Sequence, residues 1–523
     1  MVEATKITAD TSLQTLPDDC GMLKQMVLTL LAQIDDLNGQ LYYLKRQLFG
    51  KKSEKLDPAQ RLLFENLYDE VQAKIEQQQP SEKKRVKTRK NANHKGRRPL
   101  PADLPRQTIE IEPSESEKTC ALCHTPKERI GQEVTEKLEY VPASFYVKQY
   151  VRPKYACKAC EGEIAIGSLP PMAIDKGIPG EGLLAHIITS KYADHAPLNR
   201  LEGILKRHGV HINVSTMCDW VGKSADLLEP LVQRMHEKIL QSPKINTDDT
   251  AIPIKSPNRK GSTYNGYLWV YIDDQFNVVF DFTPTRSREG PLKFLGDYAG
   301  KVQADAYSGY DEFFRRSQTA EVGCHAHARR KFEYALDSDP VRAAHMMVFW
   351  GRLYEIESRA RKEEYTPDQL LEARQQQAKP ILAEIRAALD DYRLAVLPKS
   401  PMGKAITYSL NQWEALNRYT DDPLLSIDNN ISERTLRMVV IGRKNYLFAG
   451  SEAGAQRAAI LYSLVASCKL HGHDPFAYFQ DVLTKISTQP ANQIDNLLPT
   501  NWKKTNTQPQ PNPFNNPPTK NLH

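Results

Sequence analysis

The sequence predicts a multidomain α/β protein in which helical and metal-binding modules precede a larger α/β domain. Its 523 residues exceed the usual length of one domain, so we expect roughly three or four units. A leucine repeat near the N-terminus predicts a long helix, and short strand patterns alternating with helix patterns begin at Lys244. The net charge of +6 is modest for this length and does not by itself identify a polyanionic partner.

Secretion-signal patterns and cysteine content help to predict the cellular compartment. The first twenty residues contain neither a basic leader nor an apolar signal core, and no apolar run reaches the length of a membrane span. We therefore expect a soluble cytoplasmic protein without a membrane partner. In that compartment the eight cysteines are better explained as metal ligands and buried thiols than as disulfides.

Residues 21–78 carry the leucine repeat and are expected to form a coiled coil. One set of core positions is Val27, Ile34, Leu41 and Leu48, and an all-leucine set alternates with it at steps of four and three. This mixture favours a parallel pair of helices, so we expect a homodimer or higher oligomer. A helix packed on its own chain is the alternative.

A basic segment follows at residues 79–107. After Glu82 it contains no acidic residue as far as Pro99. Lysine and arginine without acids release counterions from a phosphate backbone, so the segment is a candidate for DNA binding, with a solvated tether as the alternative. The candidate phosphate contacts here are Lys83, Lys84, Arg85, Arg97 and Arg98.

Two CxxC motifs predict a zinc-ribbon-like module over residues 108–168. Cys120 and Cys123 are separated from Cys157 and Cys160 by thirty-three residues, many of them strand-forming. Four thiolates suit one tetrahedral structural Zn²⁺. Chance pairs of buried thiols are improbable at two matched motifs, and no thioredoxin-like pattern supports a redox role.

Residues 180–235 contain three successive helix patterns joined by short turns. Thr216 and Asp219 have the spacing of a capping box at the start of the third helix. A helix-turn-helix arrangement and a plain packed helix pair fit the pattern equally well. The basic residues that favour DNA binding are Arg200, Lys206, Arg207 and Lys223.

The strand patterns that follow predict a ribonuclease-H-like domain over residues 240–485. Three strand patterns come first, then a helix pattern, then a fourth strand ending just before Asp305. A polar helical stretch at about 335–417 is expected to be an insertion. In such a domain carboxylates stand on the first strand and at the end of the fourth. These positions hold Asp248 or Asp249 and then Asp305.

A third carboxylate is expected from the helical segment DNNISERTLR. Asn430, Glu433 and Arg437 are three and four residues apart and therefore share one helix face. Asp428 or Asn429 can cap the start of this helix. Glu433 would then face inward beside a cation.

Three converging carboxylates predict a divalent-metal site. Hard oxygen donors suit two Mg²⁺ or Mn²⁺ ions about 3.5 to 4 Å apart, which serve phosphodiester displacement. Each residue also has a structural explanation. Asp248 and Asp249 fit a strand-end turn, Asp305 fits a helix cap, and Glu433 fits a surface pair with Arg437. The order of the carboxylates along the strand pattern favours the metal site.

These motifs together resemble the large transposase of the insertion-sequence sixty-six family, from the leucine repeat to about residue 502. The resemblance is carried by the paired CxxC motifs and by TDDT at 247–250, ADAYSGY at 304–310, HARRKF at 327–332, DNNISERTLR at 428–437, IGRKNYLFAGSEAGAQRAA at 441–459, LYSLVASCKLHGHDPFAYFQDVL at 461–483 and LLPTNW at 497–502.

The resemblance implies a DDE transposase with a ribonuclease-H-like core, a zinc module, a helix-turn-helix region and a helical insertion. Carried over position by position, its catalytic and metal-binding residues would be Asp248, Asp305 and Glu433. Families of this kind often have Glu where Asp249 stands, so Asp248 and Asp249 both stay open for the first position. Phosphate contacts near the site would be Arg437, Arg443 and Lys444.

The implied activity is cleavage at the ends of the insertion element and transfer of the released 3′-hydroxyls to target DNA. The implied partners are terminal-repeat DNA, target DNA and small accessory proteins of the same element, in the bacterial cytoplasm at the nucleoid. His325 and His327 fall near Asp305 and are expected to be structural.

Three other functions fit part of the pattern. A zinc-containing helix-turn-helix regulator or a decayed transposase would bind DNA without cutting it, and a plain metal nuclease would cut without joining. Residues 486–523 are expected to form a short C-terminal element followed by a disordered tail rich in Pro and Asn.

Overall fold

A computed structural model describes residues 145–155, 165–166, 168–174, 177–257, 259, 261–316 and 319–504. Residues from 154 onward belong to one compact unit, distinct from residues 79–153. Several predicted features lie outside the described residues: the coiled coil, the basic segment, the tail after 504, and the residues Lys83, Lys84, Arg85, Arg97, Arg98, Cys120, Cys123, Cys157 and Cys160. Among the described residues, no helix is long and apolar enough to span a bilayer.

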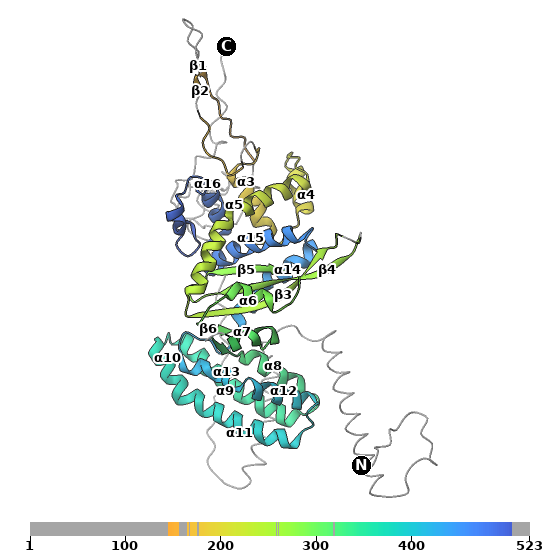
Figure 1. The fold of residues 1–523 in the computed structure, drawn as a ribbon, viewed down its shortest axis with the longest axis vertical. Helices are drawn as coiled ribbons and strands as arrows, with labels where there is room; N and C mark the ends of the chain where they lie inside the picture. The colour runs from red at the N-terminus through yellow and green to blue at the C-terminus, as the bar shows by residue number, and fades with distance from the viewer. Residues whose placement is uncertain are drawn as a thin grey trace, which may run out of the picture. The chain divides into compact units, whose positions relative to one another are not determined.

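A five-stranded mixed sheet organises the compact unit (Figure 1). Its order is β5-β4-β3-β6-β7; β3, β4 and β5 are antiparallel neighbours, while β6 and β7 run parallel to β3. The predicted order of three strands, a helix and a fourth strand is present, and β7 is an addition. The bounds are β3 Lys244–Lys255, β4 Thr263–Ile272, β5 Val278–Thr283, α6 Glu289–Leu295, β6 Lys301–Gln303 and β7 Ala320–Val322. A separate two-stranded pair joins β1 Lys154–Tyr155 and β2 Ala165–Ile166.

Strand β3 is the longest strand and is only partly covered on its β6 side. β6 pairs with Lys244 to Asn246 alone, whereas β4 pairs with β3 along its whole length. Beyond Asn246, β3 therefore has an open edge, which tolerates Pro253 because proline has no backbone N–H to donate. Ala449 docks onto this edge as an isolated bridge at Ile254.

Among the described residues, six helices of ten or more residues share one hydrophobic core with the sheet. They are α3 Glu181–Tyr192, α4 Leu198–Arg207, α5 Val214–Gln241, α14 Asn430–Tyr446, α15 Glu452–Leu470 and α16 Pro475–Lys485. α15 lies on β5, where the Ser467 and Ser463 hydroxyls accept hydrogen bonds from the backbone N–H groups of Val278 (2.9 Å) and Phe280 (2.8 Å). The three helices predicted for residues 180–235 are present and belong to this core.

The capping box predicted at Thr216 is wrong. The third helix, α5, begins at Val214 with Asn213 as its N-cap, so Thr216 already lies inside the first turn. Asp219 instead forms a salt bridge of 2.8 Å with Lys223 one turn later. The helix also continues through Pro230 to Gln241, beyond the predicted end, because its buried face keeps packing on the core.

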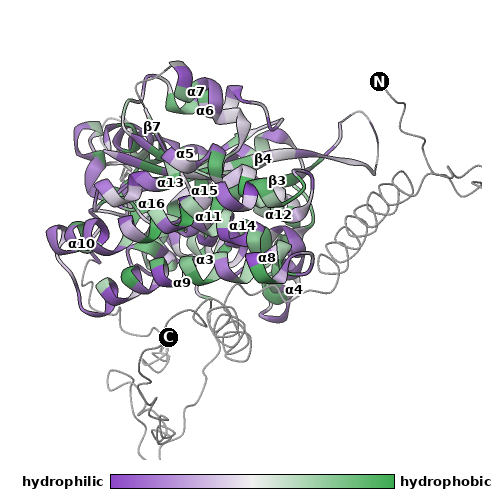
Figure 2. Cartoon of the chain, turned by 90° about the horizontal axis from the view of Figure 1, so that it is seen from below, coloured by the Kyte–Doolittle hydropathy of each residue, from purple (hydrophilic) through white to green (hydrophobic). Residues whose placement is uncertain are grey.

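A second hydrophobic core lies in the helical region between β7 and α14. Its elements are α8 His325–Ala335, α9 Pro340–Lys362, α10 Pro367–Ala373, η3 Arg374–Ala378, α11 Lys379–Ala395, α12 Pro401–Asn411 and α13 Trp413–Asn417. Ala373 is the one buried residue of α10, and Figure 2 shows purple, hydrophilic segments on this helix. The polar stretch predicted to be an insertion is therefore helical with a core of its own.

One buried ion pair crosses this second core. Both nitrogens of the Arg374 guanidinium edge donate to Glu357, at 2.8 and 2.9 Å, and the third donates to the carbonyls of Tyr419 and Asp422. Arg374 is 1% exposed and Glu357 is 6% exposed. Each nitrogen of the Arg374 guanidinium thus has at least one acceptor, and both side chains of the pair are buried.

We predict that Arg374→Met destabilises the protein by about 3 to 5 kcal/mol, because it leaves the Glu357 charge buried without its partner. The matched control is Arg386→Met, which breaks an exposed pair with Asp390 and should cost about 1 kcal/mol or less. Urea unfolding of the two variants measures the difference. Equal losses of stability would contradict this role for the buried pair.

Candidate active site

Strand β3 presents two neighbouring aspartates to opposite faces of the sheet, because side chains alternate along a strand. Asn246 and Thr250 contact the side of α14: Asn246 donates to Asn429 at 3.0 Å, and Thr250 accepts from Arg443 at 2.9 Å. Asp248 lies between Asn246 and Thr250 and shares their face.

The other face of β3 holds Thr247 and Asp249. The Thr247 hydroxyl lies 3.1 Å from the Tyr310 hydroxyl. The Asp249 carboxylate is bound by the guanidinium of Arg286 in a forked contact of 2.8 to 3.0 Å, and its side chain is 5% exposed. Asp249 therefore already has a cation. This difference favours Asp248 as the metal-binding aspartate.

Glu433 lies in the first turn of α14 and faces α8. Its carboxylate is 3.3 Å from Nη2 of Arg330 and 3.5 Å from Nε2 of His327. Its side chain is 28% exposed, so it is reachable from solvent. As predicted, Glu433 lies beside a cation, but this cation is Arg330 of α8 and not Arg437.

Three buried amide side chains tie together the elements that carry the carboxylates. Asn246 of β3 donates to Gln303 of β6 and to Asn429, at 3.0 Å in each case. Asn429 donates in turn to the Thr247 carbonyl at 2.8 Å, and Gln303 donates to the Ser426 carbonyl at 2.6 Å. All three amides are 0 to 1% exposed. We call this set the amide network.

Each candidate carboxylate lies one structural repeat beyond a member of this amide network. Asp248 follows Asn246 by two residues, Asp305 follows Gln303 by two, and Glu433 follows Asn429 by four. Two residues is the side-chain period of a strand, and four is close to one turn of a helix, although Asp305 lies just past the end of β6. Asp305 and Glu433 both act electrostatically on Asp248, so the three carboxylates lie in one region. Asn429 is the N-cap residue of α14 but makes no side-chain cap hydrogen bond, and the Asp428 carboxylate before it accepts from the Asn430 N–H at 3.1 Å.

The carboxylates act on one another electrostatically. Burial and, after it, the negative charges of Asp305, Asp249 and Glu433 together raise the pKa of Asp248 to about 8. Burial also raises the pKa of Asp305, which His327 and Arg286 partly offset. A positive charge between the two carboxyl groups would favour their ionised forms.

The three carboxylates are chemically suited to divalent cations, although their side chains do not form a group of ligands in the described structure. In the part of the chain with described coordinates, no three His, Cys, Asp or Glu side chains form a group that could hold a metal ion. The contacts of Glu433 with Arg330 and His327 give the reason, because α8 holds its carboxylate. Carboxylate oxygens are the donors that Mg²⁺ and Mn²⁺ prefer.

The basic residues expected near the site lie on α14. Arg437 and Lys444 are exposed. Arg443 is half-buried and fastens α14 to β3, donating to Thr250 and to the Ala251 carbonyl. Its placement next to the Asp248 face was expected, but this anchoring contact with the strand was not.

The two histidines differ. His325 is fully buried, with Nε2 2.8 Å from the Leu416 carbonyl and Nδ1 accepting from Trp350 at 3.1 Å, and burial lowers its pKa to about 4. It is structural, as expected. His327 lies beside Glu433, and its charge lowers the pKa of Asp305, so it belongs to the site. The HARRKF motif contains both His327 and Arg330, whereas no spacing in the sequence points to Arg286.

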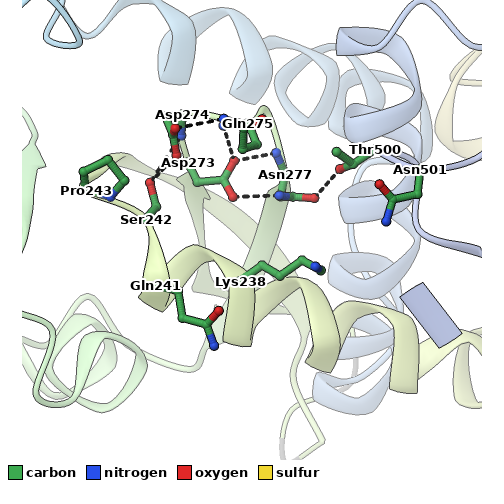
Figure 3. A pocket seen from close by; sticks show the side chains of 10 residues that line it. All are labelled: Lys238, Gln241, Ser242, Pro243, Asp273, Asp274, Gln275, Asn277, Thr500 and Asn501. Carbon is green, nitrogen blue, oxygen red and sulfur yellow. Dashed lines mark hydrogen bonds between the residues drawn. The ribbon is translucent and has the colours of Figure 1, made fainter. Parts of the chain in front are cut away.

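A polar cavity of about 330 Å³ lies at the start of β3 (Figure 3). Ser242 and Pro243, just before β3, line it together with Asp273 and Asn277. Its polar groups are already joined: the Asn277 amide donates to Asp273 at 2.7 Å and accepts from the Thr500 hydroxyl at 2.5 Å. None of the candidate site residues lines this cavity, and we assign it no function.

Comparison with protein families agrees with the motifs. The model described as transposase IS66 family matches residues 176–457, and that of the zinc-finger binding domain of transposase IS66 matches 117–161. The IS66 C-terminal element matches 463–500, and the transposase C of IS166 homeodomain matches 36–109. Matches over more than half of the chain define the class as a DNA transposase.

The chain belongs to the IS66 transposase family. The uncharacterized protein y4jD of Sinorhizobium fredii is 33% identical over 511 residues, covering 94% of this chain and 98% of that protein. The uncharacterized protein y4hP of the same organism is 30% identical, covering 88% and 87%. Family membership implies DNA as the partner, divalent metal use in the main domain and zinc binding in the zinc-finger domain.

We predict that Asp248→Asn stabilises the metal-free protein at pH 7 by about 1 to 2 kcal/mol, because Asp248 must take up a proton on folding at this pH and Asn need not. The pKa of Asp248 is raised in the folded state from 3.8 to about 8. The cost of this proton uptake therefore grows as pH rises through that interval, and the gain should vanish near pH 4. Thermal unfolding between pH 4 and 9 measures this.

Asp249→Asn is the matched control for this measurement. It removes the partner of Arg286, so it should lower stability slightly or leave it unchanged at pH 7. Mn²⁺ should raise the melting temperature of the wild type more than that of Asp248→Asn. A gain for Asp248→Asn that does not depend on pH would contradict the buried-charge explanation.

Proposed function

We propose that this transposase cleaves DNA at the ends of its insertion element and transfers the 3′-hydroxyl ends to target DNA. The observation that supports the proposal is the amide network, since Asp248, Asp305 and Glu433 follow its three members by two, two and four residues along the chain. The strand order β5-β4-β3-β6-β7 supports the further proposal that the sheet is a ribonuclease-H-like core.

Asp248, Asp305 and Glu433 would hold two Mg²⁺ or Mn²⁺ ions. When bound, such ions activate the attacking oxygen and neutralise charge on the phosphodiester and leaving group. The protein contributes the positions. β3 and β6 fix the two aspartates through Asn246 and Gln303, and α14 brings Glu433 from the other side.

Several cations around the carboxylates have separate roles in this proposal. Arg286 neutralises Asp249 and keeps it away from the metal set. Arg330 and His327 hold Glu433 until a metal competes for it. Arg437 and Lys444, exposed on α14, would contact DNA phosphates next to the carboxylates.

Two further parts of the function concern residues outside the described ones. We propose that Cys120, Cys123, Cys157 and Cys160 hold one structural Zn²⁺, since four thiolates from paired CxxC motifs match its tetrahedral preference. We also propose that residues 21–78 join two or more copies, and that accessory proteins of the same element take part. Lys83, Lys84, Arg85, Arg97 and Arg98 would bind the DNA backbone.

The test is cleavage and strand transfer by the full chain on DNA carrying the element's ends, with Mg²⁺ or Mn²⁺. Asp248→Asn, Asp305→Asn and Glu433→Gln should each lose both reactions by at least about a hundredfold, with end binding retained. The matched control Asp297→Asn, at an exposed position after α6, should keep both.

The outcomes separate the competing functions. Cutting without joining, even with target DNA and accessory proteins supplied, would indicate a plain nuclease. End binding by the wild type with no cutting under any metal condition would indicate a regulator or a decayed transposase. Full activity in any of the three variants would remove that residue from the site.

A further inference from the structure

The turn between α14 and α15 exposes two large apolar side chains. Leu447 is 65% exposed and Phe448 is 43% exposed, although both follow a helix that packs on the core. Water contact with such side chains is unfavourable, so neighbouring exposed apolar groups often mark a contact surface. We call Leu447 and Phe448 the apolar pair.

The backbone under this apolar pair is strained and firmly held. Leu447 has φ of 69°, and the Phe448 N–H donates to the Tyr446 carbonyl at 2.9 Å, which closes a γ-turn of the rare positive-φ kind. The Leu447 N–H donates to the Arg443 carbonyl at 2.8 Å. The Ala449 N–H donates to the Pro253 carbonyl of β3 at 2.8 Å, and the Ala449 carbonyl accepts from the Lys255 N–H at 2.9 Å. Strain maintained by its surroundings in this way is typical of functional positions.

Several basic residues lie near the apolar pair along the chain or on adjoining elements, and the acidic Glu452 follows it at the start of α15. Lys444 is exposed in the last turn of α14, and Lys255 and Arg259 are exposed where β3 turns toward β4. Arg200 of α4 donates to Asn445 at 3.3 Å, so α4 adds a further cation beside the end of α14. Apolar side chains framed by cations suit DNA, since phosphates bind the cations and the apolar groups enter between bases.

The position along β3 gives the distance from the candidate carboxylates. Ala449 bonds to Pro253, five residues beyond Asp248 on the same strand. At roughly 3.3 Å per residue this separation is about 17 Å. That distance corresponds to roughly five base pairs of B-form DNA at about 3.4 Å each.

We propose that Leu447 and Phe448 form a wedge that enters the base stack of bound DNA about five base pairs from the cleaved phosphate. The inference rests on the proposed function, because it takes DNA held at the carboxylates as the substrate. The wedge would unstack the bases there and so fix the register of the end DNA relative to Asp248. The two side chains are positioning residues.

The experiment uses the full chain bound to element-end DNA that carries 2-aminopurine at single positions, with Ca²⁺ in place of Mg²⁺. Wild-type protein should raise the fluorescence at roughly three to seven base pairs from the cleaved phosphate and not farther away. The double variant Leu447→Gly, Phe448→Ser should lose this rise about tenfold while end binding changes by less than about threefold.

The glycine in this variant guards against a folding artefact. Glycine adopts positive φ without steric cost, so Leu447→Gly relieves strain, and its melting temperature should not fall. The matched control is Leu394→Ser, which removes a leucine that is 90% exposed on α11 and should keep the full rise.

Three results would overturn the proposal. One is bound wild-type protein that raises no fluorescence at these positions, and another is a double variant that keeps the rise. The third is a change in oligomeric mass in the double variant with the rise intact, which would make the apolar pair a protein contact. The fluorescence measurement with Ca²⁺ does not depend on cleavage. A fluorescence rise without any DNA cleavage under Mg²⁺ would therefore contradict the proposed function and still support the wedge.

Discussion

The arrangement of the site depends on a buried exchange of hydrogen bonds among Asn246, Gln303 and Asn429. These amides come from β3, from β6 and from the start of α14, and none of them is accessible to water. A buried amide without partners is costly, so the three elements are stable together mainly in the register that satisfies all of them. The positions of the three carboxylates therefore depend on that register.

The same arrangement makes the site intrinsically unfavourable in the absence of a cation. Burial and mutual repulsion raise the pKa of Asp248 and of Asp305, while Glu433 is held by groups on α8. Packing of the helices on the sheet must compensate for this cost. A divalent cation bound among these carboxylates would lower this cost, because it favours their ionised forms.

The sequence was sufficient for the succession of three strands, a helix and a fourth strand, and for the helical character of the 335–417 stretch, because these depend on local pattern. It left Asp248 and Asp249 open, because the choice depends on which face of β3 meets α14 and which meets Arg286. The amide network was not predictable, since Asn246 and Asn429 are 183 residues apart. The misplaced cap at Thr216 came from spacing alone, which could not show that the helix starts at Val214.

The central claim is that the amide network positions the metal-binding carboxylates, and Mn²⁺ affinity of the full-length protein tests it most directly. Asn429→Ala should weaken Mn²⁺ binding about 10- to 100-fold, since second-shell losses have this size. Ser409→Ala, which removes a buried hydroxyl in the second core, should leave the affinity unchanged. Equal Mn²⁺ affinity in folded Asn429→Ala and wild-type protein would contradict the account.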